Sequence, residues 1–294
     1  MKVRIITGLV SAMIVAAAVV FIQYQLLALL CIPFCALAAY EICHVAQVKN
    51  KAMIAAATAV AGIVPVAVEF RLLARLGLPA YAVLLLWFFL LVALMLARFE
   101  ETKFSHVLYA LLASLAAPGA ISTLLLVRSH FRLPNGAFTE QNLARYFFFF
   151  ACCCAWLTDT FAYFVGVNLG KHKLCPKISP KKTVEGAAGG ILLAALTNVG
   201  FAAMFNAFFL EHYRINLLAI GLLSVPACVI SMLGDLTAST LKRNYGAKDF
   251  GKLFPGHGGV MDRFDSLVFV VPFVYAVMLF EQAQGFELLY GALR

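Results

Sequence analysis

The side chains best suited to chemistry are five aspartates, all of which lie in the C-terminal half of the chain. They are Asp159, Asp235, Asp249, Asp262 and Asp265. Asp159 lies inside a long apolar segment, and Asp235 lies near the end of another. A carboxylate at the centre of a membrane helix costs about 2.5–3.5 kcal/mol on insertion scales, so these residues are functional candidates. Gly166, seven residues after Asp159, predicts the close approach of a neighbouring helix.

Helical spacing predicts which of these residues share a helix face. Asp235, Ser239 and Lys242 are related by i, i+4 and i+7, and Asp262 and Asp265 are related by i, i+3. Carboxylates that gather beside lysines and arginines at a membrane surface suit Mg²⁺ and phosphates. Hard cations take carboxylate oxygens, and basic groups neutralise the remaining phosphate charge.

A glycine-rich segment, 251–259, comes directly before the last two aspartates and reads GKLFPGHGG. Gly258 and Gly259 predict a backbone that approaches phosphates closely and presents N–H groups to them. For His257 we leave three roles open: a general base, a hydrogen-bond donor to phosphate, or a donor that orders the loop.

A second basic segment, 178–186, carries the signals of a helix start. Ser179 is predicted as the N-cap and Pro180 as the first helical residue. A helix N-terminus that carries Lys181 and Lys182 is an anion site by geometry and charge. The alternative is a basic loop that only fixes the membrane topology.

The elements that must position these residues are membrane helices. Of the 294 residues, 63% are hydrophobic and 13% are charged, with a mean hydropathy of +0.93. These values exclude an ordinary soluble domain, a disordered chain and a disulfide-stapled secreted fold. Apolar runs predict an all-α polytopic membrane protein of about nine spans. The predicted spans are residues 5–21, 25–40, 52–69, 78–97, 107–127, 145–166, 187–209, 216–237 and 264–281. The eight cysteines form no zinc pattern and are predicted to be small buried hydrophobic residues.

The distribution of basic residues predicts the orientation. With a cytoplasmic N-terminus, the inner segments hold 16 of the 23 lysines and arginines and the outer segments hold 7. This explains the net charge of +9 without a nucleic-acid partner. We read the first span as an uncleaved membrane helix rather than a signal peptide. The loops 167–186 and 238–263 then both face the cytoplasm and are predicted to build one site. We divide the chain into scaffold helices (1–140) and a catalytic region (141–294).

The segment from Ser239 to Asp265 resembles the signature of the phosphatidate cytidylyltransferase family, also called CDP-diacylglycerol synthases. The resemblance covers 27 contiguous residues at fixed spacing. It rests on Ser239-Thr240-Leu241-Lys242-Arg243, on Lys248-Asp249-Phe250-Gly251 and on the run from Pro255 to Asp265. Residues 179–183, 159–163 and 234–236 are similar to the family as well. Ala238 departs from the pattern, because the family commonly has a glutamate there.

The resemblance implies a Mg²⁺-dependent enzyme of many membrane helices, with a cytoplasmic site and a homodimeric assembly. Its substrates would be CTP and phosphatidate, and its products CDP-diacylglycerol and pyrophosphate. We expect it in a bacterial inner membrane, among membrane lipids. Asp235 and Asp262 are the leading metal ligands, Asp159 and Asp265 are further candidates, and a second cation is left open. The candidate catalytic residues are Asp235, Asp262, Lys242, Arg263 and His257. The candidate substrate-binding residues are Lys181, Lys182, Ser239, Arg243, Lys248, Gly258 and Gly259.

Two other functions are compatible with buried carboxylates in a membrane protein. An ion-coupled transporter would be favoured by inverted repeats and polar groups at the midplane, whereas here the polar residues gather at one membrane face. A CTP-dependent polyprenol or lipid kinase would use a similar constellation of acids and lysines. The signature favours cytidylyl transfer over both.

Overall fold

The computed structural model describes residues 26–131, 141–254 and 258–292. Within these ranges, eight helical segments are long and apolar enough to cross a membrane. They are Leu27–Val45, Lys51–Glu69, Ala80–Ala97, Phe104–His130, Gln141–Leu169, Val184–Phe208, Leu217–Asn244 and Met261–Gln284. Each corresponds to a predicted span, so the all-α polytopic membrane architecture is confirmed. The predicted span 5–21 lies outside the described residues.

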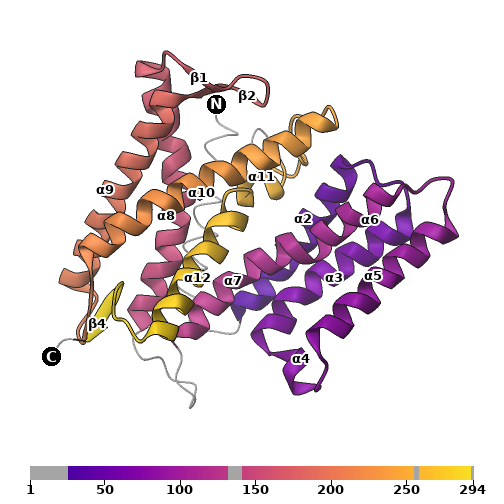
Figure 1. Ribbon diagram of the computed structural model, residues 1–294, viewed down its shortest axis with the longest axis horizontal. Helices are drawn as coiled ribbons and strands as arrows, with labels where there is room; N and C mark the ends of the chain where they lie inside the picture. Colours follow the sequence, from indigo (N-terminus) through magenta and orange to yellow (C-terminus); the bar gives the residue numbers. More distant parts are fainter. Residues whose placement is uncertain (1–25, 132–140, 255–257, 293–294) are drawn as a thin grey trace. The chain divides into compact units, whose positions relative to one another are not determined.

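The spans are built from helices that alternate with short loops and with strands that form two small antiparallel pairs (Figure 1). The helices are α2 (Leu26–Val45), α3 (Lys51–Glu69), α4 (Leu72–Arg75), α5 (Ala80–Ala97), α6 (Phe104–Leu111), the π-helical segment η2 (Leu112–Ala116), α7 (Ala117–His130), α8 (Gln141–Leu169), α9 (Val184–Phe208), α10 (Leu217–Asn244), α11 (Met261–Phe264) and α12 (Leu267–Gln284). The strands are β1 (Lys173–Cys175), β2 (Ser179–Thr183), β3 (Tyr213–Ile215) and β4 (Tyr290–Ala292).

The helices turn large apolar side chains outward, as expected of helices that face lipid. In α5, for example, Leu86 is 69% exposed and Phe89 is 59% exposed. An apolar surface of this extent is rare on a soluble monomer and marks a membrane-facing surface. All eight cysteines lie in the described ranges, none is disulfide-bonded, and seven are buried. The prediction that the cysteines are small buried hydrophobic residues is therefore confirmed for seven of them, whereas Cys175 on β1 is half-buried.

The chain folds into two compact units. The first comprises Met1–Leu126 and Leu241–Phe264, and the second comprises Val127–Thr240 and Asp265–Arg294. In the first unit α2 packs along α3, and the short helix α11 lies against α2. The rings of Phe34 and Phe264 meet there at 5.6 Å between centroids. The functional boundary predicted at residue 140 is a different kind of division and stays a prediction.

The second unit is organised by the tightly packed pair α8 and α9, which run side by side in Figure 1. Glycines make the close approach possible. A Cβ on Gly186 would lie 2.6 Å from the carbonyl oxygen of Ala162, and a Cβ on Gly190 would lie 2.7 Å from that of Thr158. A Cβ on Gly166 would lie 2.8 Å from Thr183 Oγ1. The prediction that Gly166 allows close helix approach is confirmed, and this packing fixes the α8 turn that carries Asp159.

Two antiparallel strand pairs lie at opposite ends of this helix pair, and only β1 and β2 are neighbours in the chain (Figure 1). At one end β1 pairs with β2, with Lys173 opposite Thr183 and Cys175 opposite Ser179. At the other end β3 pairs with β4, with Tyr213 opposite Ala292 and Ile215 opposite Tyr290. The two ends of the second unit therefore present different loops and different side chains.

The helix start predicted at Ser179 is wrong. Ser179 to Thr183 form strand β2, and α9 begins only at Val184. The N-cap is Thr183, whose Oγ1 accepts a hydrogen bond from the N–H of Gly186 at 3.1 Å. Both Ser179 and Thr183 are good caps, but pairing with β1 holds Ser179 in an extended backbone. Lys181 and Lys182 consequently lie on a strand and not on a helix N-terminus.

Candidate functional site

The centre of the second unit's candidate site is an ion cluster formed by Lys182, Asp159 and Asp235. The Lys182 ammonium pairs with Asp235 Oδ2 and lies 3.3 Å from Asp159 Oδ1. Three elements supply these groups, because Lys182 lies on β2, Asp159 on α8 and Asp235 on α10. The side chains of Lys182 and Asp235 are 22% and 19% exposed, and that of Asp159 is 39% exposed. The cluster is therefore only partly shielded and remains open to a ligand.

The electrostatics of this cluster hold Lys182 in its charged form. Burial by itself would lower the pKa of the Lys182 ammonium, but the charges of Asp159 and Asp235 outweigh burial and raise that pKa above its usual value. One lysine thus faces two carboxylates, which leaves the cluster with one excess negative charge.

Two carboxylates that converge on one cationic group also suit a divalent cation. The Lys182 ammonium occupies the position between Asp159 and Asp235 where such an ion would bind. Mg²⁺ typically uses one or two protein carboxylates and completes its shell with water and substrate phosphates. In the part of the chain that the structure describes, no group of three or more His, Cys, Asp or Glu side chains is arranged to hold a metal ion. The residues present therefore fit a shared protein–phosphate ion better than an ion held by protein alone.

The first unit contains a second cluster, centred on Asp262 at the start of α11. Asp262 Oδ1 accepts a hydrogen bond from Lys242 Nζ at 2.6 Å, and the two side chains are only 6% and 8% exposed. Asp262 Oδ2 accepts hydrogen bonds from the N–H groups of Phe250 at 2.7 Å and Gly259 at 2.9 Å. Lys242 also lies over the Phe250 ring, 5.0 Å from its centroid. One carboxylate thus ties the end of α10 to both sides of the glycine-rich segment.

The glycines of this segment are required by its geometry. Gly258 has a φ of +84°, and a Cβ there would lie 2.6 Å from Asp262 Oδ2. The N–H of Phe254 donates to the carbonyl oxygen of Gly258 at 2.9 Å, which closes the loop. Any larger residue at position 258 would need a strained backbone and would displace the Asp262 carboxylate.

Glu41 on α2 was missed by the sequence analysis and completes this second cluster. Its Oε1 accepts from the N–H of Val260 at 3.0 Å and its Oε2 accepts from the N–H of Met261 at 2.8 Å. The residue is 6% exposed. A Cβ on Gly251 or Gly259 would overlap its carboxylate. Glu41 therefore caps the start of α11 although it lies more than 200 positions away in the chain. No local sequence motif predicts this contact.

The remaining predicted residues take varied positions. Ser239 is half-buried on α10. Because α10 runs from Leu217 to Asn244, Asp235, Ser239 and Lys242 lie on one continuous helix, as predicted. Asp265 is buried and its Oδ1 accepts from the N–H of Ser266 at 2.8 Å. Because α11 ends at Phe264, the prediction that Asp262 and Asp265 share a continuous helix face is wrong.

The other basic candidates lie at the surface. Lys181, Arg243, Lys248 and Arg263 are all exposed. Arg243 donates to the carbonyl oxygen of Ala247 at 2.8 Å, which closes the turn after α10. The candidate His257 lies outside the described residues. The roles predicted for these side chains stay predictions.

Similarity to known proteins covers most of this chain. The model of the Cytidylyltransferase family matches residues 2–280. A phosphatidate cytidylyltransferase of Bacillus subtilis is 48% identical over 123 residues, which are 42% of this chain and 44% of that protein. Phosphatidate cytidylyltransferases of Staphylococcus haemolyticus and Staphylococcus epidermidis are 40% and 45% identical over 124 residues, 42% of this chain and 45% of each relative. The matched segments thus span less than half the length of these relatives, while the family model spans nearly the whole chain. The chain belongs to the Cytidylyltransferase family.

Proposed function

We propose that the protein transfers the cytidylyl group of CTP to phosphatidate, giving CDP-diacylglycerol and pyrophosphate. The observation that carries the proposal is the pair of acid–lysine clusters at the loops that join membrane helices, within a chain of the Cytidylyltransferase family. The similar proteins of Bacillus and Staphylococcus carry the name phosphatidate cytidylyltransferase. The substrates CTP and phosphatidate are carried over to this chain from that similarity.

The proposed cofactor is Mg²⁺, held by Asp159 and Asp235 together with oxygens of the nucleotide phosphates. The ion would neutralise phosphate charge and favour departure of pyrophosphate. The Lys182 side chain, which faces both carboxylates, would then reorient so that its ammonium donates a hydrogen bond to a phosphate oxygen. Asp262 remains a candidate ligand, but both of its oxygens already accept hydrogen bonds that order the glycine-rich segment. Its proposed main role is therefore to hold that segment in place.

The proposed reaction needs no strong general base. An oxygen of the phosphatidate phosphate forms a bond to the α-phosphorus of CTP, and the bond from that phosphorus to the β-phosphate bridging oxygen breaks. The second pKa of a phosphate monoester is about 6, so the attacking oxygen is already largely ionised at neutral pH. What the protein supplies is positioning and neutralisation of phosphate charge. Arg243, Lys248 and Arg263 stay candidates for phosphate binding on the sequence resemblance alone.

The same proposal includes the setting of the enzyme. The protein is an integral membrane protein, and its relatives are bacterial. We place the site on the cytoplasmic side of a bacterial inner membrane, where CTP is available, on the basis of the distribution of basic residues. A homodimer is proposed from the family resemblance alone.

The test uses purified protein in detergent with phosphatidate, Mg²⁺ and radiolabelled CTP. We expect label in the lipid fraction from α-³²P CTP and none from γ-³²P CTP. Label from the γ position would identify a lipid kinase, and transfer from neither position by folded protein would refute an enzyme of this class. Lys182→Met should abolish transfer, whereas Lys177→Met, which removes an exposed lysine from the same hairpin, should not.

A further inference from the structure

The second unit contains a cavity at the end that carries β3 and β4, away from the Lys182 cluster. Its volume is about 290 Å³. Leu143 in its wall and Asp159 lie on the same helix, α8, 16 residues apart. At 1.5 Å per residue, that places the cavity about 24 Å from the cluster along the helix. With the orientation predicted from the basic residues, this end faces the outer side of the membrane.

A buried carboxylate without a full set of partners lines this cavity. Glu281 on α12 is 6% exposed. Its Oε1 accepts a hydrogen bond from the N–H of Leu289 at 2.7 Å. Its Oε2 is buried and has no hydrogen-bond partner among the described residues. A buried carboxylate oxygen is costly to leave unpaired, so a donor or a cation that enters the cavity would be stabilised there.

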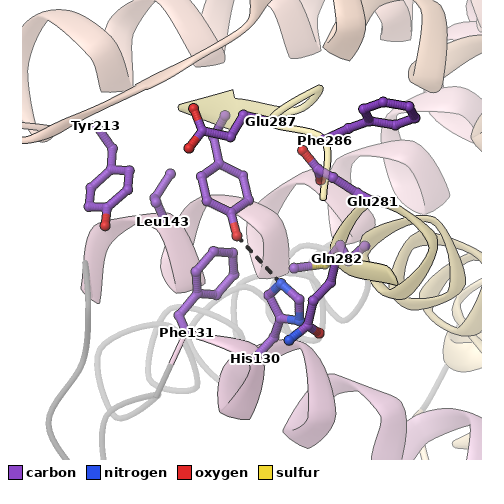
Figure 2. Close-up of a pocket in the computed structure, with 10 residues that line it drawn as sticks. His130, Phe131, Leu143, Tyr213, Glu281, Gln282, Phe286 and Glu287 are labelled. Carbon is purple, nitrogen blue, oxygen red and sulfur yellow. Dashed lines mark hydrogen bonds between the residues drawn. The ribbon is translucent and has the colours of Figure 1, made fainter. Parts of the chain in front are cut away.

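The rest of the wall favours a cation of a particular kind. Glu287 adds a second carboxylate at the exposed mouth, and no described lysine or arginine is among the residues that line the cavity. Phe131, Tyr213 and Phe286 contribute aromatic rings. Figure 2 shows His130 and Phe131 on the lower side of the cavity in this view, with Glu281, Phe286 and Glu287 above them. Aromatic faces and carboxylates together attract an ammonium ion, through cation–π and charge-assisted contacts.

The alternative of a metal ion fits these residues less well. Throughout the described residues, no group of three or more His, Cys, Asp and Glu is arranged to hold a metal. The ring of His130 is engaged with the Tyr290 hydroxyl, with 3.4 Å between Nε2 and Oη. Burial, followed by the charge of Glu281, raises the pKa of Tyr290 to about 12, so this hydroxyl stays neutral and available as a hydrogen-bond partner. An organic ammonium ion, by contrast, can be bound by carboxylates and aromatic rings alone, and the cavity wall supplies both.

We propose that this cavity binds a small organic ammonium group, with Glu281 as the buried counter-ion and Phe286 as part of the aromatic wall. The volume lies at the lower end of the range of ligand pockets, about 300–1,000 Å³, and so suits a headgroup-sized ligand rather than a drug-sized one. The ammonium could come from the headgroup of an aminophospholipid or from a free amine in solution. The site is separate from the proposed cytidylyl transfer and does not depend on it.

The test measures binding to the full chain in two arms. In the first arm, ethanolamine is titrated in detergent and the rise in Tm is compared with that given by NaCl at equal ionic strength. In the second arm, native mass spectrometry compares retention of phosphatidylethanolamine with that of phosphatidylglycerol. We expect at least one arm to show selective binding of the amine. Saturation in the first arm alone identifies a free amine, and selectivity in the second alone identifies a lipid headgroup.

Matched variants connect the binding to this cavity. Glu281→Gln should weaken amine binding about tenfold or more, because a hydrogen bond to a charged group contributes about 1.5–3 kcal/mol. Phe286→Ala should weaken it about threefold to tenfold, through the lost cation–π contact. The controls are Glu211→Gln and Phe280→Ala, which change an exposed acid and an exposed ring outside the cavity.

If Glu281→Gln does not fold, Phe286→Ala and Glu287→Gln carry the test, because both change exposed residues at the mouth. The proposal is overturned if neither amine is bound, if Na⁺ or phosphatidylglycerol binds equally well, or if the cavity variants bind the amine as tightly as the controls do.

Discussion

Replacement of Glu41 by glutamine tests how strongly one distant carboxylate orders the glycine-rich segment. The carboxylate accepts two backbone hydrogen bonds, at 3.0 Å from Val260 and 2.8 Å from Met261. A carboxamide has one oxygen and one NH₂ group. It can therefore accept only one of the two, and its NH₂ would face the other N–H. One buried backbone N–H would be left without an acceptor, at a cost of about 1–3 kcal/mol.

This cost should appear as local opening rather than as global unfolding. α11 contains only four residues, and its start is held by Glu41 and by Asp262. A loss of about 2 kcal/mol corresponds to about a 30-fold increase in the opening equilibrium, since each 1.4 kcal/mol is a factor of ten. Hydrogen exchange followed by mass spectrometry should show about that acceleration at Val260 and Met261. Peptides from α5 should exchange as in the parent protein.

The control is Glu101→Gln, in the same unit. Glu101 pairs with Arg98 at 3.7 Å, but both side chains are more than half exposed, so the pair contributes little. Transfer of the cytidylyl group should fall in the Glu41 variant and not in the control. Unchanged exchange at residues 260 and 261 in Glu41→Gln would refute the claim that this carboxylate caps α11, whatever happens to activity.

Three further predictions concern the two clusters and the N-cap of α9. Lys182→Met should abolish transfer and lower Tm, because it leaves two carboxylates facing each other without the ammonium. The double variant Lys182→Met/Asp235→Asn should recover Tm but not activity. Equal Tm in the single and double variants would contradict the charge argument. Asp262→Asn leaves the buried Lys242 without its counter-charge, so we expect the free energy of unfolding to fall by up to about 3–5 kcal/mol, seen as a lower Tm, together with loss of turnover. Retained turnover would exclude both a metal role and an ordering role. Thr183→Ala should cost about 1 kcal/mol through loss of the α9 N-cap, read from thermal unfolding, and Thr183→Ser should restore it.

The sequence predicts the membrane helices well because hydrophobicity over about 20 residues is a strong local signal. Eight predicted spans correspond to helical segments. The local error at Ser179 has a different origin. A cap residue followed by proline is a good helix start. However, pairing of β2 with β1 keeps the backbone extended at Ser179, so the helix begins later and its N-cap is Thr183, four residues further along the chain. The pairing of β1 with β2 decides which of the two cap residues starts the helix, and the local sequence around either residue does not reveal that pairing.

The candidate site shows the same limit more sharply. Asp159 and Asp235 stand out in the sequence because acids in apolar segments are rare. Nothing in the sequence predicts that Lys182 is the lysine that reaches both of them, whereas the neighbouring Lys181 is exposed. Glu41 is missed for the opposite reason. It lies at the end of an N-terminal span that has no motif, and its partners are backbone N–H groups, which carry no residue identity.

In both clusters a lysine neutralises a carboxylate that would otherwise be costly in an apolar helix, and this pairing limits how ligands can bind. An acid within or at the end of an apolar helix is stabilised by a lysine: Lys182 for Asp159 and Asp235, and Lys242 for Asp262. A lysine engaged in this way has fewer free N–H donors for a phosphate unless another positive charge replaces it at the acid. At the Lys182 cluster, a cation that arrives with the nucleotide would do so, and the released ammonium would follow the phosphate. At Asp262 the buried pair has no such opening, since backbone N–H groups occupy the second oxygen. In the Lys182/Asp235 double variant we therefore expect Tm to recover without activity. Removing one positive and one negative charge returns the cluster to one excess negative charge, but it also removes both the lysine and an ion ligand.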